Sequence, residues 1–81
     1  VLSRAVALGE SMVRAGETAT APIVAAMVKL IEAEPLAKID YVKAVDGVTV
    51  TPVDAVAAGT LFAMAVYIGK TRLIDNFIVG A

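Results

Sequence analysis

The sequence predicts an α+β fold in which an N-terminal helical hairpin is followed by a small three-stranded antiparallel sheet, in the order ααβββ. Apolar residues recur at three- and four-residue steps up to residue 34, as in helices packed on one side. From residue 39 the pattern changes to alternation, with β-branched and aromatic residues enriched. With 81 residues, the chain suffices for one small domain with a modest core.

Two helices joined by a short link are expected in the first part of the chain. The first covers residues 1–15, and its apolar stripe consists of Leu2, Ala5, Val6, Gly9, Met12 and Val13. The second covers residues 21–34, and Thr18 or Thr20 is expected to cap its N-terminus. Pro35 ends this helix because the residue before a proline disfavours helical geometry.

Three strands are expected to follow, over residues 39–45, 60–68 and 73–79. Alternation in the first strand places Ile39, Tyr41, Lys43 and Val45 on one side and Asp40, Val42 and Ala44 on the other. Asp40 could pair with Lys38 or with Arg72. The second strand is so apolar that a cover on both faces is expected. Residues 69–72 form the turn before the last strand. Helices would cover one face of this sheet, so a neighbouring domain or a second copy is expected on the other.

The region between the first two strands is less defined by its sequence. Asp46 and Gly47 mark a turn. Residues 48–50 either extend the strand briefly or belong to the loop, and residues 53–58 fit a loop or a short helical turn.

Composition narrows the class of protein. Hydrophobic residues make up 59% of the chain and charged residues only 19%, an excess that indicates burial against a partner surface or a membrane. The longest uncharged stretch, residues 55–69, is shorter than the roughly 20 residues of a membrane-spanning helix, which favours the partner surface and no membrane.

A net charge of −1 without a basic tail gives no support for nucleic-acid binding. The absence of Cys and His excludes Cys/His zinc sites, thiol nucleophiles and histidine bases, and fits a cytoplasmic protein.

The candidate site residues lie near the C-terminus: Lys70, Thr71, Arg72, Asp75 and Asn76. The first three could contact a phosphate or carboxylate, or could form a solvated hairpin turn. Asp75 could position a ligand, or could pair with Arg72 or with the backbone and so fix the strand register. For the first three residues the structural interpretation is favoured because the Gly-rich phosphate loop of nucleotide sites is missing. For Asp75 it is favoured because no second acid or base is close in sequence.

The motif Ile68-Gly69-Lys70-Thr71-Arg72-Leu73-Ile74-Asp75-Asn76 resembles the C-terminus of the pantothenate synthetases, the pantoate–β-alanine ligase family. Ile39-Asp40-Tyr41-Val42 with Val45-Asp46 is similar to an earlier strand of that family. The resemblance covers almost the whole chain, with one departure at Gly47, where the family often has proline and a slightly longer loop.

The resemblance implies an enzyme that joins pantoate to β-alanine, with ATP and Mg²⁺, through a pantoyl adenylate. Its Rossmann-like nucleotide-binding domain carries the His-containing motif and the Met-Ser-Ser-Arg-Asn segment, and neither motif occurs in this sequence. Residues 1–81 are therefore expected to be the C-terminal lid domain of a homodimeric ligase, inactive alone, with no catalytic, cofactor-binding or metal-binding residue of its own. The start at Val1 without Met is expected to be a cut inside a longer polypeptide. The alternative is a free-standing α+β interaction module that dimerises through its sheet.

Overall fold

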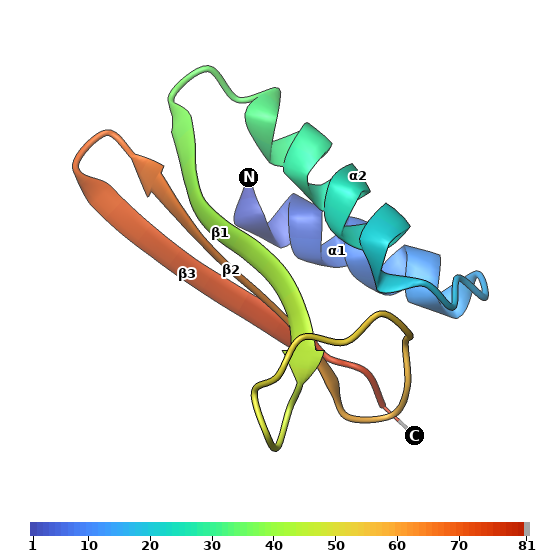
Figure 1. The fold of residues 1–81 in the computed structure, drawn as a ribbon. Coiled ribbons are helices and arrows are strands. Elements are labelled where there is room, and N and C mark those ends of the chain that lie inside the picture. The colour runs from blue at the N-terminus through green and yellow to red at the C-terminus, as the bar shows by residue number, and fades with distance from the viewer. Residues whose placement is uncertain (81) are drawn as a thin grey trace.

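The helices form one layer on a single face of the sheet (Figure 1). The computed structural model describes residues 1–80. Its elements, in order, are α1 (Leu2–Arg14), α2 (Thr20–Glu32), β1 (Ala37–Asp46), β2 (Thr60–Ile68) and β3 (Thr71–Ile78). The predicted ααβββ order is confirmed.

The two helices bury part of the predicted apolar stripes, and the remaining stripe residues are partly buried against the core: Val6, Met12, Val13 and Leu30. Leu2, Ala5 and Gly9 are buried on α1. On α2 the buried apolar residues are Ile23, Met27 and Ile31. Within residues 1–80, neither helix has both the length and the apolar character needed to cross a bilayer.

The predicted threonine cap of α2 is wrong. Ala19 is the N-cap residue and provides no side-chain cap. Thr20 is instead the first helical residue, and its Oγ1 donates a hydrogen bond of 2.7 Å to the carbonyl oxygen of Val53. Its backbone N–H donates to the carbonyl oxygen of Asp54 at 3.0 Å. Because Thr20 is buried, its polar groups satisfy a tertiary contact and tie α2 to the loop before β2.

The strands are antiparallel and follow the order β1-β2-β3, so that β2 is central. The turn between β2 and β3 is shorter than the predicted span of residues 69–72. Thr71 already pairs with Ile68, and Arg72 with Tyr67, which leaves Gly69 and Lys70 as the loop. Gly69 has a φ of 60°, a left-handed conformation that two-residue hairpin loops require.

A register shift in β1 overturns the predicted alternation of that strand. Ile39 pairs with Val66, but Tyr41 pairs with the adjacent Ala65, so Asp40 is an extra residue. Such a bulge shifts the side-chain alternation by one position. Ile39 therefore lies on the same face as Val42, rather than with Tyr41 as predicted.

The strand pairing assigns each residue of the sheet to one of two faces, because directly paired residues point to the same side. The covered face packs against the helices and consists of Ala37, Ile39, Val42, Ala44, Phe62, Met64, Val66, Ile68, Leu73, Asp75 and Phe77. The open face consists of Lys38, Tyr41, Lys43, Val45, Leu61, Ala63, Ala65, Tyr67, Arg72, Ile74, Asn76 and Ile78. The second cover expected for β2 is not supplied in full by residues 1–80: Ala65 and Val45 on the open face are buried, but Tyr67 and Ile74 remain 38% and 61% exposed.

The loop between β1 and β2 contains neither a helical turn at residues 53–58 nor a strand at residues 48–50. Asp46 organises its start, because Oδ1 accepts the backbone N–H groups of Val48 at 2.8 Å and Thr49 at 2.9 Å. These hydrogen bonds, that of Thr49 first, hold the pKa of the Asp46 carboxyl below its ordinary value. Gly47 donates its N–H to the Gly59 carbonyl oxygen at 2.9 Å, and a Cβ at Gly47 would lie 2.6 Å from that oxygen. The glycine that departs from the family pattern is thus required by this loop.

Candidate functional site

The residues of the terminal motif lie on β3 and its hairpin, but they do not converge on one point. Lys70 is exposed in the two-residue loop, and Thr71 is the exposed first residue of β3. Arg72 lies on the open face opposite Tyr67. Of these three residues, all predicted to lie in the turn, only Lys70 does so, whereas Thr71 and Arg72 belong to β3.

Arg72 makes the only salt bridge found within residues 1–80, and its partner is Asp40 on β1. The Arg72 Nη2 lies 3.0 Å and Nε 3.3 Å from Asp40 Oδ2, and the side chains are 41% and 40% exposed. This hydrogen bonding raises the pKa of Arg72 and keeps the guanidinium charged. Because β2 lies between the two strands, the pair links both edges of the sheet. Of the two partners predicted for Asp40, Lys38 and Arg72, the structure selects Arg72.

Asp75 and Asn76 point to opposite faces of the sheet. Asp75 is half-buried on the covered face opposite Met64, and Asn76 is exposed on the open face opposite Ala63. Of the two pairings predicted for Asp75, with Arg72 or with the backbone, the structure has the backbone one, because alternation along the strand places Arg72 with Asn76 and not with Asp75. The Asp75 Oδ1 instead accepts the backbone N–H of Asn76 at 2.8 Å.

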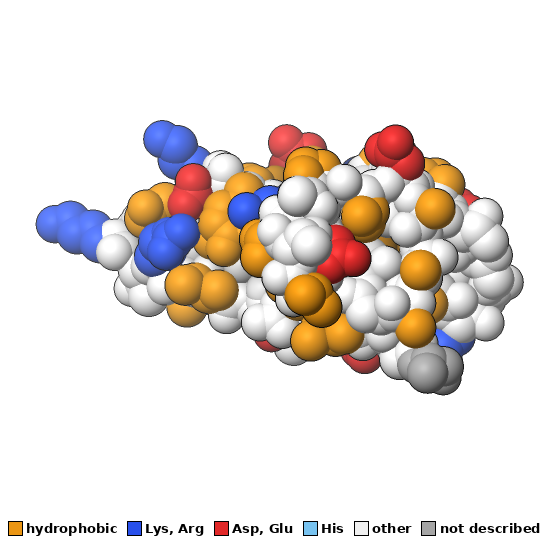
Figure 2. Space-filling model, turned by 60° about the horizontal axis from the view of Figure 1, so that its bottom comes forward, with side chains coloured by type: hydrophobic (Ala, Val, Ile, Leu, Met, Phe, Trp, Pro, Cys, Tyr) orange, Lys and Arg blue, Asp and Glu red, His pale blue; other side chains and the backbone are white. Residues whose placement is uncertain are grey.

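The fold gathers cations that are distant in the sequence. Lys38 and Arg72 flank Tyr67 in register from β1 and β3, and Lys70 occupies the adjoining hairpin loop. Figure 2 shows several Lys and Arg side chains gathered at one end of the molecule. Further along β1, the Lys43 Nζ lies 4.6 Å from the centroid of the Tyr41 ring. The sequence did not reveal this basic end, because only strand pairing brings residues more than 30 positions apart together.

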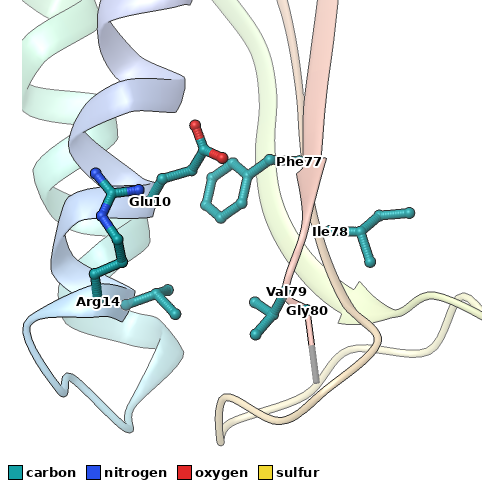
Figure 3. A pocket seen from close by; sticks show the side chains of 7 residues that line it. Glu10, Arg14, Phe77, Ile78, Val79 and Gly80 are labelled. Carbon is teal, nitrogen blue, oxygen red and sulfur yellow. The ribbon is translucent and has the colours of Figure 1, made fainter.

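A pocket of about 290 Å³ lies elsewhere, between α1 and the end of β3. Its lining residues are Glu10, Val13, Arg14, Phe77, Ile78, Val79 and Gly80. In Figure 3, Phe77 points from β3 toward α1, whereas Ile78 points away from the helix. None of the five motif residues lines this pocket. Among residues 1–80, no three His, Cys, Asp or Glu side chains lie close enough to hold a metal ion.

The fold and its terminal motif define a small two-layer α+β domain whose hairpin is tied across the sheet by Arg72 and Asp40. A family model described as pantoate-beta-alanine ligase matches residues 1–78, and the chain belongs to this family.

Similar proteins support the same assignment. The chain is 49% identical over 77 residues to the pantothenate synthetase of Ruminiclostridium cellulolyticum, a match that covers 95% of this chain and 27% of that protein. It is 47% identical to the pantothenate synthetase of Heliobacterium modesticaldum, covering 98% and 28%. A crystal structure of pantothenate synthetase from Thermus thermophilus superimposes with a TM-score of 0.88 at 28% identity, covering 99% of this chain and 29% of that one. The chain thus spans little more than a quarter of the length of these relatives.

Proposed function

We propose that residues 1–81 form the C-terminal lid domain of a pantothenate synthetase that uses ATP and Mg²⁺ to join pantoate to β-alanine. The family match over residues 1–78 carries this proposal. In the reaction, the pantoate carboxylate attacks the α-phosphorus of ATP, which releases pyrophosphate and forms pantoyl adenylate. The β-alanine amine then attacks the acyl carbon, and AMP leaves.

The upstream Rossmann-like domain would carry out both chemical steps, and residues 1–81 would close over its active site. This chain has no His or Cys, and its terminal motif lies spread over two faces of β3. A mixed anhydride such as pantoyl adenylate hydrolyses in water, so a lid that excludes water directs it to the amine. The whole enzyme is proposed to be a cytoplasmic homodimer.

The open face is the surface proposed to dock on the upstream domain. Its β3 residues Ile74 and Ile78 are 61% and 62% exposed and, with Tyr67 on β2, give this face an apolar surface that a partner could bury. The basic end around Lys38, Lys70 and Arg72 would then approach the phosphates of the substrate or an acidic rim of that domain. The five motif residues have structural or interface roles in this proposal, with no catalytic role.

A graft tests this assignment directly. The enzyme of R. cellulolyticum would be prepared without the 77 residues that this chain matches, and again with this chain in their place. We expect the truncated enzyme to release more AMP than pantothenate, because the adenylate is lost to hydrolysis, and the graft to restore a ratio near one. The isolated 81-residue chain should release no AMP.

Two results would contradict the proposal. One is turnover by the isolated chain. The other is a folded graft whose ratio of AMP to pantothenate equals that of the truncated enzyme. A graft carrying Phe62→Ala, which removes a core side chain, serves as the matched control for a domain that is present but not folded.

A further inference from the structure

The pocket between α1 and the end of β3 lies on the helix side of the sheet, away from the open face proposed for docking. Its volume of about 290 Å³ is at the lower limit of the roughly 300–1,000 Å³ that is typical of small-molecule sites. A ligand of this pocket would therefore be a small metabolite. The residues that line it restrict the chemistry of that metabolite further.

One wall of the pocket is apolar and held in place. It consists of Val13 on α1 together with Phe77 and Val79 at the end of β3. The Phe77 ring stacks on Phe62 with the centroids 4.8 Å apart, and a Cβ at Gly9 would lie 2.8 Å from it, so the ring has little room to move. A wall that is already ordered loses little conformational freedom when a ligand binds. The pocket thus offers a preformed surface to an apolar group.

Two opposite charges lie beside this wall, Glu10 and Arg14, one turn apart on α1. A Glu four residues before an Arg is well placed for an ion pair on a helix, yet within residues 1–80 neither side chain makes a salt bridge. In Figure 3, the Glu10 carboxylate points from α1 toward Phe77, whereas the Arg14 side chain runs along the helix. The pocket therefore presents one negative and one positive charge, each available to a ligand.

This combination disfavours most classes of small ligand. An apolar molecule would exclude water from two charges without pairing them, which costs free energy. A carboxylic acid without a cation would be repelled by Glu10, and an amine without an anion by Arg14. A zwitterion with an apolar group satisfies both charges and also covers the wall.

We propose that this pocket binds a free amino acid with an apolar side chain. The carboxylate of the amino acid pairs with Arg14, whose guanidinium can donate two parallel hydrogen bonds to it. Its ammonium group pairs with Glu10, and its side chain lies on Val13, Phe77 and Val79. The inference depends only on the pocket and not on the role of a lid.

Leucine and two analogues that each lack one of its charges test the proposal: isocaproate has no ammonium group, and isoamylamine has no carboxylate. Binding to the 81-residue chain is followed by the amide chemical shifts in NMR spectra, which also report whether the chain is folded. We expect leucine to bind saturably, with the largest shifts at Val13, Val79 and Gly80. Each analogue should bind about five- to tenfold more weakly, because it loses one ion pair and lies near a like charge. Glycine, which keeps both charges but has no apolar side chain, should also bind more weakly than leucine.

Two variants provide a crossed comparison. Glu10→Gln should weaken the binding of leucine and strengthen that of isocaproate, because it removes the charge that repels this analogue. Arg14→Gln should weaken leucine and strengthen isoamylamine for the corresponding reason. Arg4→Gln is the matched control, since Arg4 is exposed on the same helix and does not line the pocket. It should leave the binding of all three molecules unchanged.

Three results would overturn the proposal. One is binding of either analogue as tight as that of leucine, and another is an equal effect of Arg14→Gln and Arg4→Gln on leucine. The third is a folded chain that shows no saturable shifts at the pocket residues. The graft described above carries the same pocket, so the same titration applies to it, with the truncated enzyme as the blank.

Discussion

The side chains on the two faces of the sheet differ in how far they are exposed to solvent, even along a single strand. On β2, Phe62, Met64 and Val66 face the helices and are fully buried. On the same strand, Tyr67 faces outward and is 38% exposed, next to Ile74 on β3 at 61%. Both faces are rich in apolar residues, yet only one is covered by the helices. This difference separates the residues that stabilise the fold from those available for contacts with a partner.

The interactions on the two faces also differ in kind. On the covered side, the rings of Phe62 and Phe77 stack with centroids 4.8 Å apart and planes 8° from parallel. The open face instead carries the ion pair between Arg72 and Asp40. Apolar burial contributes most to stability, whereas solvent-exposed ion pairs contribute little. Three sets of substitutions test this division.

The largest effect is expected from Phe62→Ala. Removing a fully buried aromatic side chain costs about 3–5 kcal/mol, since it leaves a cavity and ends the stacking on Phe77. A domain of 81 residues has a free energy of unfolding of roughly 4–12 kcal/mol, at about 0.05–0.15 kcal/mol per residue. We therefore expect a large loss of stability in urea denaturation, up to complete unfolding.

The matched change on the open face is Tyr67→Ala, on the same strand. We expect a loss of about 1 kcal/mol or less, as for surface substitutions in general. Similar losses for Phe62→Ala and Tyr67→Ala would show that the open face is also part of the stabilising core and would contradict the division.

A smaller effect is expected where α1 meets the covered face. A Cβ added at Gly9 would lie 2.8 Å from the Phe77 ring and 2.9 Å from the Met27 sulfur. Overpacking costs about 1–3 kcal/mol, and the gain in helix propensity from Gly to Ala returns about 1 kcal/mol. Gly9→Ala should therefore lower the free energy of unfolding by up to about 2 kcal/mol in urea denaturation.

Ala7→Gly is the control for helix propensity, because Ala7 is exposed on the same helix. It should cost about 1 kcal/mol. A stabilised Gly9→Ala variant would mean that the helix propensity dominates and that α1 and β3 are not closely packed at this position.

The sequence was sufficient for the element order, because periodicity and the Pro35 and Asp46-Gly47 signals are local. It was insufficient for the faces of β1, since the Asp40 bulge depends on how β1 pairs with β2 and not on the residue type. The role of Thr20 was missed for the same reason: its partner Val53 is 33 positions away. Among the candidate site residues, the Asp40–Arg72 pair was one of two predicted alternatives. The backbone contact of Asp75 was likewise one of two, since alternation places the side chains of Asp75 and Arg72 on opposite faces.

The smallest effect is expected from the ion pair on the open face, measured as the coupling between Arg72→Ala and Asp40→Ala in a double-mutant cycle. Two nitrogens of Arg72 donate hydrogen bonds to Asp40, but both side chains are exposed. Each substitution should therefore lower the free energy of unfolding less than Gly9→Ala does. The coupling should fall further toward about 1 M salt, where the screening length is about 3 Å. Lys43→Ala with Asp40→Ala is the control, because Lys43 lies over Tyr41 and makes no salt bridge with Asp40. A coupling that persists in high salt and matches the loss from Gly9→Ala would mean that Arg72 stabilises the sheet as the core does. Its place in the terminal motif would then be explained by the fold alone, and a contact with the proposed upstream domain would not be needed to account for it.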